Sequence, residues 1–390
     1  MKSIKRAGME KQKMTSLLPN IDPDGLLEYS VVFTDRSLNH MSQSFQAVMR
    51  EISSTLKDVY SAEAAIVVPG GGTYAMEAVA RQFATDKKCL VIRNGYFSYR
   101  WSQIFDAGGI PADTIVKKAR PSSAAPQSPF TSCPVDEVVS TIKKAKPRIV
   151  FAPHVETSSG IMLPDDYLIA VATATHEVGG LFVLDCVASG AMWIDMNSIG
   201  VDILISAPQK GWSSSPCAGL VLLNASALAA IESTSTTSFA CDLKKWLEIM
   251  RAYEQGGHAY HATMPTDSLA RFRTMMQETV HYGLEKLRAK QQQLGDRVRA
   301  LLSEHGFESV AAEGFQSPSV VVCYTDSVDI HNGSAFAAKG VQIAAGVPLM
   351  CDESDGFRSF RIGLFGLDKL FNIERTVAEL ERAVDTLDSG

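Results

Sequence analysis

Short apolar runs alternate with helix-like segments through most of residues 45–225. Six of these runs are rich in aliphatic and β-branched residues: AAIVV, CLVIR, RIVFAP, LFVLD, DILIS and GLVLL. Amphipathic segments such as TYAMEAVARQFA and YFSYRWSQIFDAG separate several of them. Continuous apolar strands spaced by helices are typical of a mostly parallel sheet that helices cover on both faces. We therefore predict an α/β fold with a ligand site beyond the carboxyl ends of the strands.

The pattern changes after residue 265. Residues 267–306 form a charged, amphipathic stretch with helical periodicity, and we expect the helix to break near Leu294 or Gly295. The strand-like segments SVVVCY and SFRIGLF and a final helical segment, NIERTVAELERAVDTL, follow. We therefore predict an N-terminal segment over residues 1–25, a large domain over 26–265 and a smaller C-terminal α+β domain over 266–390.

The composition is that of a globular protein. With 390 residues, 46% of them hydrophobic, the chain can bury a sizeable core. A net charge of −6 and the lack of any Lys/Arg-dense stretch argue against nucleic acid and anionic membrane surfaces as partners. No apolar run approaches the ~20 residues that a membrane span needs. The basic start MKSIKRAGMEKQK lacks the apolar region of a secretory signal, although organelle targeting stays open.

Seven cysteines are scattered along the chain without a CxxC pair. An odd count at irregular spacing indicates reduced thiols and neither a disulfide framework nor a zinc site. We therefore expect a cytoplasmic protein without a structural metal.

Gly70–Thr73 directly follow the first apolar run and open a helix. Glycines let backbone amides approach an anion, and a helix N-terminus adds free N–H groups and a favourable dipole. The segment is a candidate phosphate cradle, with a bare tight turn as the structural alternative. No GK[ST] follows, so it is not a Walker A loop.

Polar or aromatic residues also follow the other runs. Phe97 can stack on a flat ring, although it can equally be core. Thr157 belongs to the polar segment HVETSSG, which can also be a capped loop. Asp185 ends a buried run, where a carboxylate needs a partner. Lys210, between two apolar runs, is expected to be partly desolvated and able to form an imine with an aldehyde, or else to form a salt bridge.

Together these residues specify one ligand. It has a phosphate for Gly71–Thr73, a flat ring for Phe97, a basic ring nitrogen for Asp185 and an aldehyde for Lys210. Pyridoxal 5′-phosphate (PLP) has all four features.

The motifs that carry these residues resemble those of the class V family of fold-type I aminotransferases, in particular its alanine–glyoxylate and serine–pyruvate group. The matching motifs are GGGTYAMEA, NGYFSYR, HVETSSG, VLDCVAS, SAPQKGW, YHATMP and FRIGLFG, in that order. The resemblance implies a fold-type I PLP-transferase, with a mostly parallel sheet between helices and a smaller C-terminal domain. It also implies ping-pong transfer of an amino group from a small amino acid, of the alanine or serine type, to a 2-oxo acid such as glyoxylate or pyruvate.

Each matching position carries an implied role toward the cofactor. The cofactor-binding positions are Gly71, Gly72 and Thr73 with Gln209 at the phosphate, Phe97 and Val187 on the two ring faces, Thr157 near the ring hydroxyl, Asp185 at the ring nitrogen, and Lys210 as the Schiff-base lysine. Lys210 and Asp185 are the catalytic pair.

The resemblance also implies how substrate and a second subunit take part. Arg361 matches the arginine that binds the substrate carboxylate, a task that suits a bidentate guanidinium. Tyr260 and Thr263 match residues that reach the phosphate of the neighbouring subunit's cofactor, which implies a homodimer with shared active sites.

Other functions stay open. The loop GGGTYAMEAV also resembles that of 2-aminoethylphosphonate–pyruvate aminotransferases, and Gly71 and Thr73 stand where glyoxylate enzymes commonly carry Ser and His. A PLP-dependent lyase or cysteine desulfurase is a further alternative, because Cys351 lies shortly before Arg361. A non-catalytic protein of the same fold is the third class, against which the intact Asp185–Lys210 pair argues.

Overall fold

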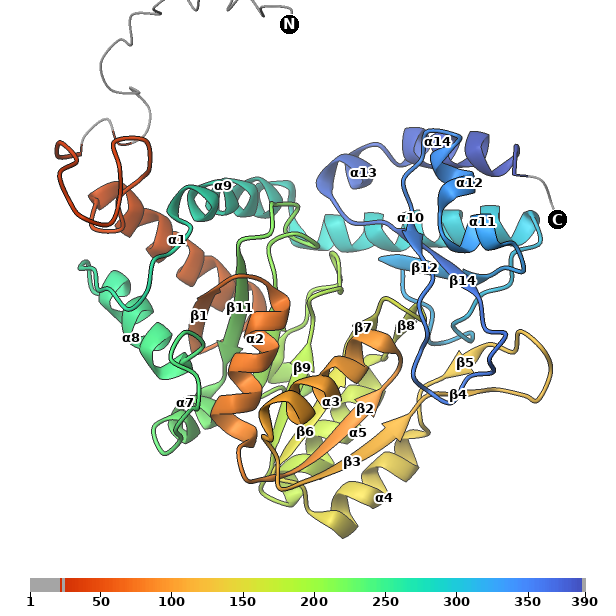
Figure 1. Cartoon of the computed structure of the whole chain (residues 1–390), viewed down its shortest axis with the longest axis horizontal. Helices are drawn as coiled ribbons and strands as arrows, with labels where there is room; N and C mark the ends of the chain where they lie inside the picture. The colour runs from red at the N-terminus through yellow and green to blue at the C-terminus, as the bar shows by residue number, and fades with distance from the viewer. Residues whose placement is uncertain (1–21, 23–24, 388–390) are drawn as a thin grey trace, which may run out of the picture.

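Seven strands form the central sheet of the computed structural model, which describes residue 22 and residues 25–387 (Figure 1). The strands are β1 (Ala64–Pro69), β2 (Lys88–Arg93), β3 (Asp113–Lys118), β6 (Ile149–Pro153), β9 (Leu181–Asp185), β10 (Ile203–Ser206) and β11 (Ala218–Leu223). Their spatial order is β1-β11-β10-β9-β6-β2-β3. All neighbours pair in parallel except β11, which is antiparallel to both β1 and β10. The predicted α/β fold with a mostly parallel sheet is confirmed.

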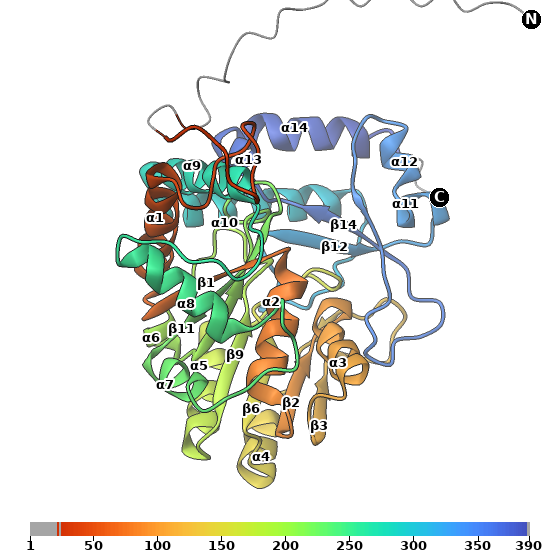
Figure 2. The ribbon, with the colours of Figure 1, turned by 60° about the vertical axis from the view of Figure 1, so that its left-hand side comes forward.

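Helices cover this sheet. They are α1 (Gln43–Tyr60), α2 (Gly72–Val79) with its π-helical continuation η1 (Ala80–Ala84), α3 (Tyr96–Gly108), α4 (Val135–Ala145), α5 (Asp165–Glu177), α6 (Met196–Ile199), α7 (Ala225–Ile231) and α8 (Leu243–Glu254). Figures 1 and 2 show α2 and α3 together on one side of the sheet. The side chains of β6, β10 and β11 are buried at every position, so both faces of these strands are covered. This explains why their sequences are continuously apolar and do not alternate.

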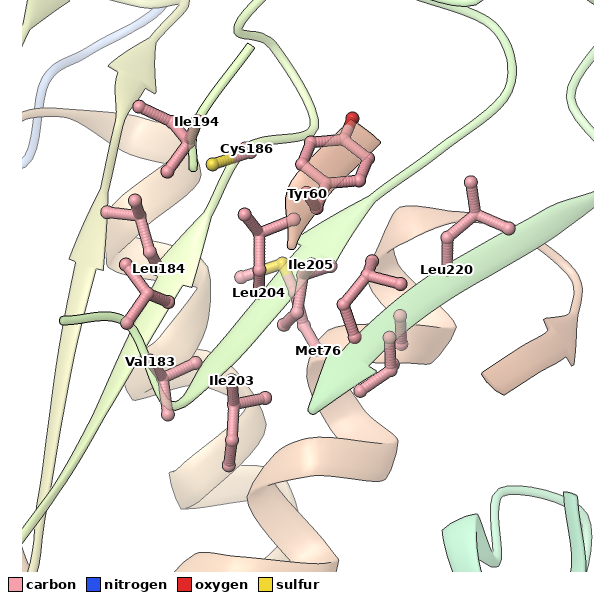
Figure 3. Packing of buried hydrophobic residues seen from close by; sticks show 14 of the residues in the cluster. Tyr60, Met76, Val183, Leu184, Cys186, Ile194, Ile203, Leu204, Ile205 and Leu220 are labelled. Atoms are coloured by element: carbon pink, nitrogen blue, oxygen red, sulfur yellow. The ribbon is translucent and has the colours of Figure 1, made fainter. Parts of the chain in front are cut away.

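The core lies between the middle strands and the helices beside them. Figure 3 shows Val183, Leu184 and Leu204 of the neighbouring strands β9 and β10 in one packed cluster with Tyr60 of α1 and Met76 of α2. Full burial of one such aliphatic side chain contributes about 1.5–3 kcal/mol relative to exposure. The rigid strands of this core hold the residues that follow them.

A second, three-stranded sheet lies near the C-terminus, in the order β12-β14-β13 (Figure 1). This region contains α9 (Thr266–Tyr282), α10 (Leu284–Glu304), β12 (Val320–Tyr324), α11 (Val328–His331), α12 (Ser334–Ala337), β13 (Ala344–Ala345), β14 (Ser359–Gly363), α13 (Leu367–Phe371) and α14 (Ile373–Val384). Two short ribbons complete the strands, β4 (Arg120–Pro121) with β5 (Phe130–Thr131) and β7 (Val155–Glu156) with β8 (Ile161–Met162).

The long helical stretch breaks at Gly283, so the expected break near Leu294 or Gly295 was wrong. Gly283 has φ of 98°, which residues with a side chain rarely adopt, and it separates α9 from α10. Gly295 is buried inside α10, where an added Cβ would lie 2.5 Å from Pro318 Cα. The glycine at 295 therefore permits close backbone packing and does not end a helix.

Gln291 ties α10 to both parts of the fold. Its buried amide nitrogen donates to the carbonyls of Pro318 (3.0 Å) and Leu364 (3.2 Å), which flank the second sheet. Its amide oxygen accepts from the backbone N–H of Ala191, near the large sheet. This side chain thus connects the second sheet to the region of the first.

The division into parts at residues 25 and 265 stays a prediction. Residues 1–21 and 23–24, nearly all of the predicted N-terminal segment, lie outside the described residues, as do 388–390. Among the helices that the structure describes, none is long and apolar enough to cross a bilayer.

Candidate active site

A cavity of about 550 Å³ lies between the strand ends of the large sheet and the second sheet. It is large enough for a cofactor together with a small substrate. Nine of the predicted site residues line it: Gly72, Thr73, Phe97, Thr157, Asp185, Val187, Gln209, Lys210 and Arg361. Residues separated by almost 300 positions in the sequence thus share one cavity, as the strand-end argument predicted.

The phosphate candidate is the start of α2. Gly71 occupies the N-cap position without a side-chain cap, and Gly72 and Thr73 open the helix. The first N–H groups of a helix have no partner within it, and together with the helix dipole they attract an anion. A Cβ on Gly72 would lie 2.8 Å from Val187 Cγ2, whereas one on Gly71 would meet nothing within 4 Å. Packing against Val187 therefore requires glycine at position 72, whereas position 71 has room for a side chain.

Asp185 stands at the end of β9 and borders the cavity. Its Oδ1 accepts the backbone N–H of Val187 at 2.9 Å, and no protein hydrogen bond of the described residues reaches its Oδ2. Burial raises the pKa of Asp185 to about 6, and the negative charge of Glu156 adds to the rise, while the Val187 N–H and Arg100 oppose it. A cationic ring nitrogen would relieve the cost of this buried carboxylate.

Lys210 lies in the turn that joins β10 to the antiparallel strand β11. Burial lowers the pKa of its ammonium, and the positive charge of Arg361 lowers it further. Its Nζ lies 4.6 Å from the ring centroid of Phe365, a residue beside the second sheet. A desolvated lysine of this kind has its neutral, nucleophilic form within reach.

Arg361 reaches the cavity from β14 of the second sheet, whereas Lys210 reaches it from the large sheet. Its Nε donates to the carbonyl of Ala345 at 2.7 Å, which fixes the plane of the guanidinium. Its Cζ lies 5.5 Å from the ring centroid of Phe97. The other guanidinium N–H groups stay available to a carboxylate.

Glu156 supports the residues of the cavity through contacts that the sequence did not reveal. Its fully buried carboxylate accepts the backbone N–H groups of Phe97 (3.2 Å) and Ser98 (2.8 Å), at the start of α3. It also accepts the hydroxyls of Ser98 (2.7 Å) and Ser158 (2.8 Å). A negative charge at this helix N-terminus stabilises the first turn of α3, which carries Phe97. The motif HVETSSG contained the residue, but its partners in α3 lie 58–59 positions away in the sequence.

Three predicted residues do not line this cavity. Gly71 lies next to it, whereas Tyr260 and Thr263 lie elsewhere, with their hydroxyls 3.1 Å apart. The ring of Tyr260 lies 5.4 Å from that of His40. The roles of these three residues, like those of the nine that line the cavity, stay predictions.

Cys351 does not fit the role of a desulfurase nucleophile. Its thiol is buried away from the residues that line the cavity and donates to the carbonyl of Arg93 at 3.4 Å. Burial raises the pKa of Cys351 to about 12, and the nearby carboxylates of Glu156 and Glu353 add to the rise. A thiol held in this neutral form is a poor nucleophile.

The residues present fit PLP. Gln209 Oε1 is buried and has no hydrogen-bond partner, so this amide, which can flip, is free for a ligand. The open N–H groups of α2, the free oxygen of Asp185 and the desolvated Lys210 complement a phosphate, a ring nitrogen and an aldehyde.

Several known proteins are similar to this chain in sequence. The family model "Aminotransferase class-V" matches residues 25–351. The 2-aminoethylphosphonate–pyruvate transaminase of Paraburkholderia phymatum is 27% identical over 90% of this chain and 89% of its own. Alanine–glyoxylate aminotransferase 1 of Saccharomyces cerevisiae is 27% identical over 64% of this chain and 66% of its own. A protein of Synechococcus sp. named soluble hydrogenase, small subunit, is 24% identical over 90% of this chain and 88% of its own.

Solved structures share the fold. The alanine–glyoxylate aminotransferase of Nostoc sp. superimposes with a TM-score of 0.75 at 23% identity, and the match covers 89% of this chain and 88% of that chain. This likeness confirms the fold-type I architecture.

We predict that Asp185→Asn stabilises the protein without cofactor. Because the pKa of Asp185 rises from 3.8 to about 6 on folding, the fold is favoured by its protonation, and that stabilisation is lost as the pH rises through 6. The variant should therefore unfold with a free energy higher by up to about 3 kcal/mol near pH 8, with a smaller gain toward pH 5. Urea unfolding of both apoproteins across this range measures the difference, and a gain independent of pH would contradict the pKa assignment.

We predict that Glu156→Gln destabilises the protein by about 2–4 kcal/mol, because an amide cannot accept all the donors that converge on the carboxylate. Glu137, an exposed carboxylate paired with Lys117 and Arg120, supplies the control variant Glu137→Gln, for which we expect a much smaller loss. Equal losses of unfolding free energy in the two variants would show that Glu156 does not hold α3.

Proposed function

The chain belongs to the aminotransferase class-V family, and we propose that it moves an amino group from a small amino acid of the alanine or serine type to a 2-oxo acid such as glyoxylate or pyruvate. As a member of this family it is a PLP-dependent transaminase. One observation carries the proposal for this chain: Lys210 and Asp185 border the same cavity as the start of α2.

The residues divide the chemistry among them. PLP, when bound, supplies an electron sink for negative charge that develops on the substrate α-carbon. Asp185 would hold the ring nitrogen in its protonated form, because its carboxylate is buried and makes no ion pair among the described residues. Lys210 would provide an amine that takes the proton from the substrate α-carbon and delivers it to the cofactor carbon that carried the aldehyde. Arg361 would orient the substrate by its carboxylate, and Phe97 and Val187 would hold the cofactor ring.

The lining of the cavity supports a small donor. Beyond Arg361, the residues contributed by the second sheet and its connections are mainly apolar or small, and they include Val320, Ile343 and Phe365. Asp185 is the one carboxylate among the described lining residues, and it is assigned to the cofactor. This side of the cavity therefore favours a single carboxylate attached to a short side chain.

2-Aminoethylphosphonate is the second candidate donor, with pyruvate as its acceptor. It is favoured by Thr73 in the phosphate loop and by the full-length match to transaminases named for this substrate. This donor has a phosphonate in place of the carboxylate, which a guanidinium also binds.

The test mixes holoenzyme with alanine, serine or 2-aminoethylphosphonate, one at a time, and follows the conversion of cofactor to its amine form by absorbance. We expect alanine or serine to react, and Lys210→Ala to lose this conversion. Arg361→Ala should raise the KM for alanine about 10–100-fold, with PLP affinity little changed, because a charge-assisted bidentate contact is lost. Reaction with the phosphonate alone would replace the proposed donor, and near-normal turnover of Lys210→Ala would overturn the mechanism.

We also propose that the chain forms a homodimer in which Tyr260 and Thr263 serve the neighbouring subunit's cofactor. An exposed apolar segment supports an interface: Leu26, Tyr29 and Val31 have relative exposures of 98%, 90% and 102%. Tyr260 is 54% exposed and lies against His40, in the same part of the fold. Such surfaces are rare on proteins that stay monomeric.

Mixing two defective variants tests the shared site. Lys210→Ala and the double variant Tyr260→Ala/Thr263→Ala are co-refolded and assayed at limiting PLP. If the residues act across the interface, hybrid dimers contain one native site, and about a quarter of wild-type activity returns. No recovery despite hybrid dimers, shown by sedimentation and differential tagging, would place these residues in their own subunit's site.

For the location, we propose the cytoplasm. All seven cysteines lie among the described residues as free thiols, which supports a reducing compartment.

A further inference from the structure

Arg100 is a charged residue of the cavity to which none of the functions above assigns a role. It lies on α3, one turn after Phe97, and lines the cavity. Its Nη1 donates to Thr73 Oγ1 at 3.0 Å, and its Cζ lies 5.1 Å from the ring centroid of Phe97. None of the ion pairs among the described residues involves Arg100.

The contact with Thr73 determines where that hydroxyl points. A threonine hydroxyl has one proton to donate, and a guanidinium has no acceptor to receive it. Because Arg100 occupies an acceptor position of Thr73 Oγ1, the hydroxyl proton must turn to another group. The N–H groups at the start of α2 lie beside it and point out of the same helix end. Arg100 thus sets Thr73 up as a donor for an anion.

The charges of the cavity support the same assignment. Its ionisable lining residues are Arg100, Asp185, Lys210 and Arg361. Asp185 is assigned to the ring nitrogen, Lys210 to the aldehyde and Arg361 to the substrate carboxylate. A phosphate monoester carries a charge of about −1.5 to −2 at neutral pH, and the loop Gly70–Thr73 contains no cation to balance it. Arg100 is the remaining positive charge, next to that loop.

We propose that Arg100 is a cofactor-binding residue that supplies the cation for the PLP phosphate and directs the Thr73 hydroxyl toward it. The proposal rests on PLP being the cofactor. It assigns the anion to the cofactor and not to a second acidic group of the substrate, because the direct contact of Arg100 is with the phosphate loop. Its position over the Phe97 ring also links the phosphate site to the ring site.

The test compares PLP with pyridoxal, which has the same ring and aldehyde but no phosphate. Apoproteins of wild type, Arg100→Met and Arg100→Lys are titrated with each ligand, and Kd is obtained from absorbance and tryptophan fluorescence. We expect Arg100→Met to raise the Kd for PLP about 10–100-fold and to leave that for pyridoxal nearly unchanged. The Kd of Arg100→Lys for PLP should fall between those of wild type and Arg100→Met, since lysine restores the charge but not the paired N–H donors of a guanidinium. Arg375→Met on α14, which removes one exposed positive charge, is the control for net charge.

Two outcomes overturn the proposal. Equal weakening of PLP and pyridoxal would show that Arg100 only supports the fold. Unchanged PLP affinity, with a raised KM for aspartate or 2-aminoethylphosphonate but not for alanine, would assign the anion to the substrate. Failure of the proposed function would look different, because wild type itself would then bind neither ligand at Lys210 in a borohydride-trapping experiment.

Discussion

The site depends on the reversal of the chain after β10. In the parallel part of the sheet, Pro153, Asp185 and Ile205 lie in register, so their strands end at one edge. The next strand, β11, returns antiparallel, and the turn that carries Lys210 must therefore lie at that same edge. Backbone pairing alone brings the Lys210 ammonium and the Asp185 carboxylate to the carboxyl ends of the parallel strands. The buried core of β9–β11 holds them there.

Burial destabilises the charged forms of both Asp185 and Lys210. Burial raises the pKa of Asp185 and lowers that of Lys210, so each is displaced toward its neutral form in the absence of a ligand. No hydrogen bond or ion pair joins the two directly among the described residues. The polar groups of the cavity thus complement a ligand better than they complement one another. This is expected of a preorganised site, in which the groups are held in place before the ligand binds.

The sequence predicted what local pattern and strand order determine. The helix over residues 96–108 and all six quoted strands occur as expected, because continuous apolar runs and their flanking glycines are local signals. The convergence of Asp185 and Lys210 followed from the rule for parallel sheets, and that of Arg361 with them followed from the resemblance alone. The predicted position of the helix break was wrong because a glycine can either end a helix or permit close packing. The sequence does not distinguish a turn at Gly283 from close packing at Gly295. The contacts of Glu156 and Arg100 were missed because their partners lie in other elements, a relation that only tertiary structure shows.

The close packing at Gly295 has a mechanical consequence. With no side chain between its backbone and Pro318, and with Gln291 bound to Leu364, α10 cannot slide along the second sheet without breaking both contacts. Leu364 is three residues from Arg361, so this contact couples the position of the helix to that of the strand that carries the guanidinium. We expect a change in this backbone contact to displace the Arg361 guanidinium while every residue of the pocket wall stays native.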